Sequence, residues 1–98
     1  MSERERLSDR RNAEVFDFDH GDRRWTATIS RFRDGRVAEI FLDGPKDSVL
    51  VEMAKETALT ASLALQCGCP LATLRHALTG RHAGPLGTAL AAIDEGAT

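Results

Sequence analysis

The feature that most constrains this chain is a change in the spacing of its apolar residues near residue 44. Before that point apolar and polar residues alternate, as they do from Trp25 to Ser30. A spacing of two is typical of strands that bury one face. After Asp43-Gly44-Pro45 the apolar residues recur every three or four positions, which indicates helices. Strands followed by helices predict an α+β fold.

Two turns that contain glycine divide the alternating segment, Ala13 to Leu42, into three strands. The first turn is Asp19-His20-Gly21-Asp22, and the second is Asp34-Gly35, a dipeptide typical of two-residue hairpins. A two-residue turn there places Ile29 opposite Ile40. The sequence therefore predicts a three-stranded antiparallel β-meander.

The two faces of this predicted sheet differ in composition. One is a core face and contains Trp25, Ala27, Ile29, Ala38, Ile40 and Leu42. On the other, mostly polar face, the two-residue turn pairs Phe32 with Val37, and Phe41 lies on the same face. Exposed apolar side chains of this kind mark interaction surfaces. We therefore expect a homodimer that buries this face or an edge strand, with Phe32, Val37 and Phe41 as interface candidates.

The first predicted helix is long and runs from about Val49 to Cys67. Asp47 or Ser48 can cap its N-terminus, and Gly68 can adopt the left-handed conformation that ends a helix. Its apolar stripe is predicted to contain Leu50, Met53, Ala54, Ala58, Ala61 and Leu65. The small alanines allow this helix to pack closely against the sheet.

Two shorter helices follow, and each is opened by a proline, which is favoured in the first helical turn. Pro70 begins the second helix and Pro85 the third, with a loop from Thr79 to Gly84 between them. The predicted inward residues are Leu71, Leu74 and Leu78 in the second helix, and Leu86, Ala89, Leu90 and Ile93 in the third. One long and two short helices are therefore expected on one sheet face.

The length of 98 residues suffices for one domain. We expect residues 1–12, which mix arginines with acids, to form a disordered polar tail, and residues 13–95 to form the domain. No apolar run approaches the ~18 residues of a membrane span. The charged start from Met1 to Arg6 is unlike a signal peptide, so a cytoplasmic protein without membrane contact is expected.

Cys67, Cys69, His76 and His82 are the candidates for a metal site. One residue separates the cysteines, whereas paired zinc ligands usually have two to four residues between them, so no metal is expected. We expect Cys67 to be buried at the end of the long helix, because a buried cysteine behaves as a small apolar residue. Cys69 precedes a helix and is the alternative as a thiol nucleophile. No general base is placed beside it, so neither a catalytic residue nor a cofactor is assigned.

Five arginines near the hairpins make nucleic-acid binding an alternative: Arg23, Arg24, Arg31, Arg33 and Arg36. They could contact phosphates while Trp25 stacks on a base. Trp25 lies on the predicted core face, however, and the net charge of −2 is unlike that of a globally basic nucleic-acid binder. The last helix also has no Arg, Lys, Asn or Gln with which to read bases. Nucleic acid is the less favoured partner.

The stretch from Gly35 to Asp43, with Lys46 after it, resembles a strand and turn of the TSCPD domain. The similarity continues through Ala61-Ser62-Leu63-Ala64-Leu65-Gln66, Gly68, Pro70-Leu71, Leu74, Ala77 and Leu78, and covers about residues 25–90. This domain is a small accessory module of adenosylcobalamin-dependent (class II) ribonucleotide reductases and also occurs as short stand-alone proteins. The Ser-Cys-Pro-Asp signature of the family is missing, since the chain reads Gly-Arg-His-Ala-Gly-Pro-Leu-Gly after Thr79.

The resemblance implies a non-catalytic accessory or protein-interaction domain linked to deoxyribonucleotide synthesis, with a ribonucleotide reductase subunit as a candidate partner. These 98 residues do not contain the reductase barrel, so we expect no enzyme activity of the chain on its own, although the family context is ribonucleoside-diphosphate reduction. Two alternatives stay open: nucleic-acid binding through the arginine-rich hairpins, and a metal- or thiol-dependent site at Cys67 and Cys69.

Overall fold

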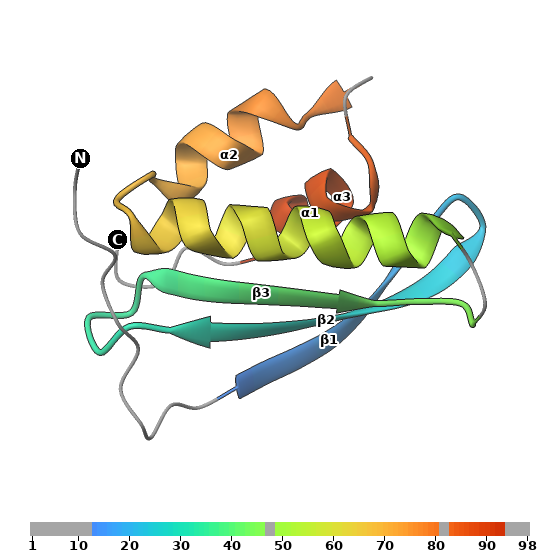
Figure 1. Ribbon diagram of the computed structural model, residues 1–98, viewed down its shortest axis with the longest axis horizontal. Coiled ribbons are helices and arrows are strands. Elements are labelled where there is room, and N and C mark those ends of the chain that lie inside the picture. Colours follow the sequence, from blue (N-terminus) through green and yellow to red (C-terminus); the bar gives the residue numbers. More distant parts are fainter. Residues whose placement is uncertain (1–12, 47–48, 81–82, 94–98) are drawn as a thin grey trace.

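Figure 1 shows the computed structural model, which describes residues 13–46, 49–80 and 83–93. Three strands are followed by three helices: β1 (Ala13–His20), β2 (Arg23–Arg31), β3 (Val37–Asp43), α1 (Val49–Gln66), α2 (Leu71–Ala77) and α3 (Pro85–Ala92). The predicted α+β fold is therefore confirmed. The predicted tail at residues 1–12, the caps Asp47 and Ser48, and His82 lie outside the described residues, as do residues 94–95 of the expected domain.

The sheet is an antiparallel meander with the order β1-β2-β3. Its first hairpin turns at Gly21 and Asp22, both with a φ of 60°. Two consecutive residues with positive φ characterise the tight turn whose twist matches that of the flanking strands. His20 accordingly lies opposite Arg23, and Phe18 lies opposite Trp25.

The second hairpin differs from the predicted two-residue turn. The Gly35 N–H donates to the Phe32 carbonyl at 3.0 Å, and the Phe32 N–H donates to the Arg36 carbonyl at 2.8 Å. Gly35 has a φ of 95°, so the loop is a three-residue turn that ends in a left-handed glycine. The pairing shifts by one residue between Ser30 and Arg31, which places Arg31 opposite Val37.

This shift corrects two of the three interface candidates. Ile29 still lies opposite Ile40, as predicted, because this pair lies beyond the irregularity as seen from the loop. Val37, however, is 3% exposed and belongs to the hydrophobic core. Phe32 is also buried, and the Arg36 guanidinium covers its ring at 4.7 Å from the centroid. The expectation that Phe32 and Val37 lie on an exposed face is therefore wrong.

The core lies between the sheet and the helices, which stand on one side of it (Figure 1). All six residues predicted for the core face are buried: Trp25, Ala27, Ile29, Ala38, Ile40 and Leu42. The buried residues of α1 are Val51, Ala54, Ala58, Ala61, Ser62, Leu65 and Gln66. Leu50 and Met53, which were expected in this stripe, are exposed, because the helix instead turns Ser62 and Gln66 toward β3.

A tight turn ends α1 at the predicted glycine. Gly68 has a φ of 101°, its N–H donates to the Leu65 carbonyl, and the Cys69 N–H donates to the Ala64 carbonyl. This pair of hydrogen bonds satisfies carbonyls that the end of the helix would otherwise leave without partners. The chain then reverses into α2, which lies above α1 in Figure 1.

The last two helices are joined by an arginine. Arg75 on α2 donates from Nε to the Leu90 carbonyl at 3.0 Å and from an Nη atom to the Ile93 carbonyl. These bonds hold the C-terminal end of α3, whose predicted inward residues Leu86, Ala89, Leu90 and Ile93 are all buried. None of the residues of α2 is fully buried, so α2 covers the rim of the core rather than its centre.

Candidate functional site

The two cysteines do not form a metal centre with the other described residues. Cys67 is exposed and Cys69 is partly exposed, so the expected burial of Cys67 is wrong. The buried face of α1 ends at Gln66, and the next residue points to the opposite side of the helix. Within the described ranges, no three His, Cys, Asp or Glu side chains gather closely enough to hold a metal ion. His76 is exposed on α2.

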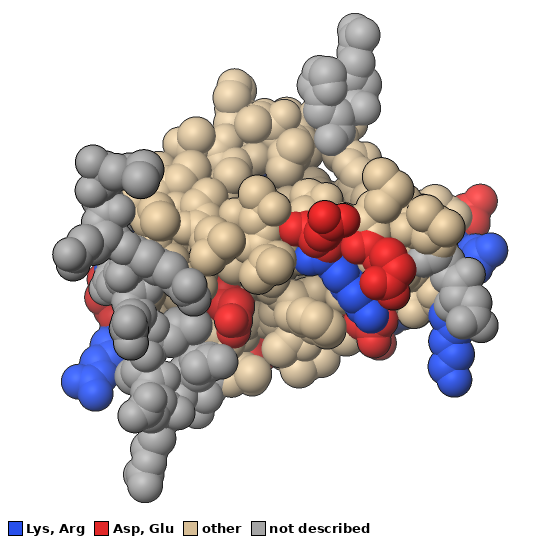
Figure 2. All heavy atoms as spheres, viewed as in Figure 1, with Lys and Arg blue, Asp and Glu red and all other residues tan. Residues whose placement is uncertain are grey.

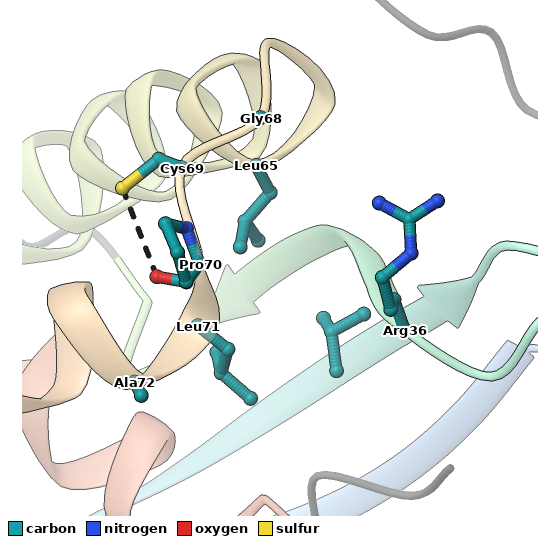
Figure 3. Close-up of a pocket in the computed structure, with 8 residues that line it drawn as sticks. Arg36, Leu65, Gly68, Cys69, Pro70, Leu71 and Ala72 are labelled. Atoms are coloured by element: carbon teal, nitrogen blue, oxygen red, sulfur yellow. Dashed lines mark hydrogen bonds between the residues drawn. The ribbon is translucent and has the colours of Figure 1, made fainter. Parts of the chain in front are cut away.

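A pocket of about 350 Å³ lies between the start of β3 and the junction of α1 with α2 (Figure 3). It is lined by Arg36, Val37, Leu65, Gly68, Cys69, Pro70, Leu71 and Ala72. The Cys69 thiol lies 3.7 Å from the Pro70 carbonyl, and its sulfur points away from Arg36 in Figure 3. The pocket therefore does not bring the Cys69 thiol and the Arg36 cation together at one point.

Two of the candidate arginines, Arg24 and Arg31, form ion pairs with acidic residues. Arg24 lies 3.0 Å from Asp19, and the hydrogen bond and charge of that carboxylate raise the pKa of Arg24. Arg31 lies 2.6 Å from Glu14. Such pairs remove much of the positive field that attracts phosphates.

Arg36 is likewise paired with a nearby acid, Asp34. The Arg36 backbone N–H and guanidinium both donate to Asp34, which lowers the pKa of that carboxyl group. Arg23 and Arg33 are exposed. Trp25 is only 1% exposed, so its ring is not available to stack on a base. The structure thus leaves the arginine-rich hairpins without the aromatic residue on which that alternative relied.

A second hollow, a groove of about 710 Å³, lies between β3 and α1. From β3 it is lined by Glu39, Ile40 and Phe41, and from α1 by Glu52, Lys55, Glu56, Leu59, Ser62, Leu63 and Gln66. Phe41 is 51% exposed and Leu59 is 61% exposed, and Leu63 is exposed beside them. Of the three predicted interface residues, Phe41 alone contributes to this groove.

Two buried polar side chains of α1 join this helix to β3 within the groove. The Ser62 hydroxyl accepts a hydrogen bond from the Ile40 N–H at 2.8 Å. The same hydroxyl donates a hydrogen bond to the Ile40 carbonyl at 3.0 Å. Gln66 Nε2 donates to the Ala38 carbonyl at 3.0 Å. These bonds satisfy three backbone groups at an edge strand, the N–H and carbonyl of Ile40 and the carbonyl of Ala38, which are otherwise available to pair with another strand. We call this hollow between β3 and α1, with the lining residues given above, the β3–α1 groove.

Acidic side chains dominate the charge of the β3–α1 groove. Glu39, Glu52 and Glu56 line it, with Lys55 as the one basic lining residue among those described. Lys55 Nζ lies 3.9 Å from Glu52 and 3.9 Å from Asp43. Figure 2 views the molecule from this side, where acidic side chains gather over the N-terminal half of α1 and the strand beneath it. The groove is therefore apolar at its walls and negative at its rim.

Sequence reasoning missed most of this groove because it extended the buried stripe of α1 to Leu50 and Met53 instead of to Ser62 and Gln66, although the other four predicted residues are buried. Two signals were present. Leu59 and Leu63 are four residues apart and form an apolar pair outside the stripe. Ser62 and Gln66 have the same spacing and adjoin the buried alanines. A polar pair beside an apolar stripe can indicate hydrogen bonds to a neighbouring strand.

Fold and site together describe a small α+β domain with a sheet covered by helices on one face and an apolar groove at one sheet edge. The TSCPD domain matches the chain over residues 4–93. The chain therefore belongs to the TSCPD domain family, as its resemblance implied. No curated protein and no solved structure gives a significant match. Among the described residues, no helix has both the length and the hydropathy that crossing a bilayer requires.

Proposed function

We propose that this chain is a non-catalytic accessory domain that acts in the cytoplasm through contacts with a partner protein in deoxyribonucleotide synthesis. Membership of the TSCPD domain family supports the link to ribonucleotide reductases, in which that module occurs. A reductase subunit is accordingly the first candidate for the partner. A homodimer is the alternative, and its contact would involve Phe41 as well.

The observation that carries this proposal is the exposure of Phe41, Leu59 and Leu63 along one groove. Large apolar side chains that stay in contact with water, grouped and surrounded by charged residues, are typical of protein-binding surfaces. The groove opens widely to solvent along a sheet edge instead of enclosing a small volume. This shape suits the side chains of another protein better than a reacting small molecule.

Affinity purification of the tagged full chain from its native cell tests the proposal, with Phe41→Asp as the comparison. We expect a ribonucleotide reductase subunit to be enriched with the parent chain and lost with the variant. The purified subunit should then change its turnover when the parent chain is added. Recovery of no reductase subunit would refute the proposed partner, and equal recovery with Phe41→Asp would refute a contact through Phe41.

A further inference from the structure

We propose that the β3–α1 groove binds a helical segment of the partner, with apolar anchor residues flanked by lysine or arginine. The inference rests on the proposed function and adds the chemistry of the partner. It follows from three properties of the groove: the closed backbone of its strand, the arrangement of its apolar residues and the sign of its charge.

The closed backbone of β3 decides between a strand and a helix as the occupant. An added strand derives its affinity from hydrogen bonds to the free edge of a sheet. Here Ser62 occupies the N–H and the carbonyl of Ile40, and Gln66 occupies the carbonyl of Ala38. Ser62 and Gln66 are each 3% exposed, so these bonds are shielded from exchange with water. A helix satisfies its own backbone groups and needs only side-chain contacts.

The two walls of the groove, α1 and β3, both contribute apolar residues. Leu59 and Leu63 lie one helical turn apart on α1, and Phe41 lies on β3. A row of apolar side chains spaced three, four and seven residues apart on an incoming helix can enter between such walls. The exposure of Leu59 and Phe41 leaves apolar area on both walls for such a helix to bury.

The charge of the groove decides between a second copy and a different protein. In a symmetric dimer through this groove, the acidic rim with Glu52 and Glu56 would approach the acidic rim of the other copy. Like charges across an interface oppose association. Lysine or arginine beside the apolar anchors of a partner would instead be attracted to Glu56. The observations therefore favour a basic partner segment over self-association.

Selection of helical peptides from a randomised phage-displayed library on the immobilised full chain tests this inference. We expect the recovered peptides to carry a net positive charge and apolar residues at helical spacing. Anisotropy with labelled peptides should show affinity that falls between low and high salt. Leu59→Ala should weaken binding about tenfold, as expected for an anchor wall. Leu50→Ala, an equal truncation on the opposite side of α1, should leave affinity unchanged within about twofold.

A second pair of variants isolates the charge. Glu56→Gln and Thr57→Lys each raise the net charge by one, but only Glu56 lines the groove. We expect Glu56→Gln to weaken binding about threefold, a typical effect of one interface charge, and Thr57→Lys to have no comparable effect. Far-UV circular dichroism of each variant verifies that it folds. Substitutions at exposed positions disturb folding little.

Three results would overturn the inference: peptides that are acidic or extended, a library without groove-dependent binders, or binding unaffected by Leu59→Ala. Sedimentation of the free chain completes the test, because a dimer that Leu59→Ala dissociates would identify a second copy as the occupant. Basic helices that bind while no reductase subunit co-purifies would refute the proposed partner but retain the inference. A reductase subunit that co-purifies equally with the parent chain and with Leu59→Ala would support the proposed partner but refute the inference about the groove.

Discussion

Removal of the Ser62 hydroxyl should destabilise the fold although it deletes a single oxygen atom. Ser62 Oγ lies 2.8 Å from the Ile40 nitrogen, 3.0 Å from the Ile40 carbonyl and 2.9 Å from the Ala58 carbonyl. In Ser62→Ala the Ile40 N–H loses its acceptor while it stays beside the helix. A buried donor left without a partner costs about 1–3 kcal/mol.

We expect Ser62→Ala to lower the free energy of unfolding by about 1–2 kcal/mol, in the lower part of that range, because the higher helix propensity of alanine offsets part of the loss. For a domain of this size the melting temperature should fall by about 4–16 °C. Urea titration followed by Trp25 fluorescence and by circular dichroism at 222 nm measures the first quantity. Amide hydrogen exchange should also become faster at Ile40 than at its neighbours on β3.

The matched control is Thr60→Ala, which deletes another hydroxyl from α1. Thr60 Oγ1 donates to the Glu56 carbonyl at 3.0 Å in an exposed position, so water replaces that bond. Alanine also has the higher helix propensity, so this variant should be as stable as the parent or slightly more stable. A loss below about 0.5 kcal/mol in Ser62→Ala, or equal losses in both variants, would refute the argument that Ser62 closes the edge of β3.

Three further predictions concern other parts of the molecule. Cys67→Ser should change the free energy of unfolding in urea by less than about 0.5 kcal/mol, because Cys67 is exposed. Asp34 should titrate, in carboxyl ¹³C NMR, with a pKa below its ordinary value of about 3.9, because the Arg36 N–H and then its guanidinium stabilise the charged form. This stabilisation is present above the unfolded pKa and disappears as pH falls through the folded pKa; Arg36→Gln, which keeps the N–H, should raise that pKa only in part. Gly44→Ala should destabilise the fold by about 1–3 kcal/mol in thermal melts, because the new Cβ would lie 2.6 Å from Cε3 of the buried Trp25 ring, and an unchanged melting temperature would contradict this.

Alternation and glycine positions were sufficient to predict the meander, the core face and the end of α1. They were not sufficient to predict the second hairpin, because Asp34-Gly35 suits both a two-residue turn and the last two positions of a three-residue loop. A shift of one residue in pairing moves side chains between the two faces of a sheet. This is why Val37 belongs to the core and not to the expected interface.

The candidate site depended on long-range contacts that local patterns do not contain. Phe41 could be predicted from its place on the polar face of a strand. Ser62 and Gln66 are polar residues, and their burial follows from partners 22 and 28 positions earlier in the chain. Once these two residues turn toward β3, Leu59 and Leu63 come to line the groove and Leu50 faces away from it.

A hydrogen bond between the ends of the fold also bears on the order in which the chain assembles. His20 Nδ1 and Thr88 Oγ1 lie 2.8 Å apart across a separation of 68 residues, and Thr88 itself donates to the Gly84 carbonyl. The entropy lost on closing a loop increases with its length, so the hairpins should form before this contact. During synthesis on the ribosome, the apolar side of β1 therefore stays uncovered until residues 85–93 have been made and α3 can pack on it. The nascent chain is prone to aggregation during that interval.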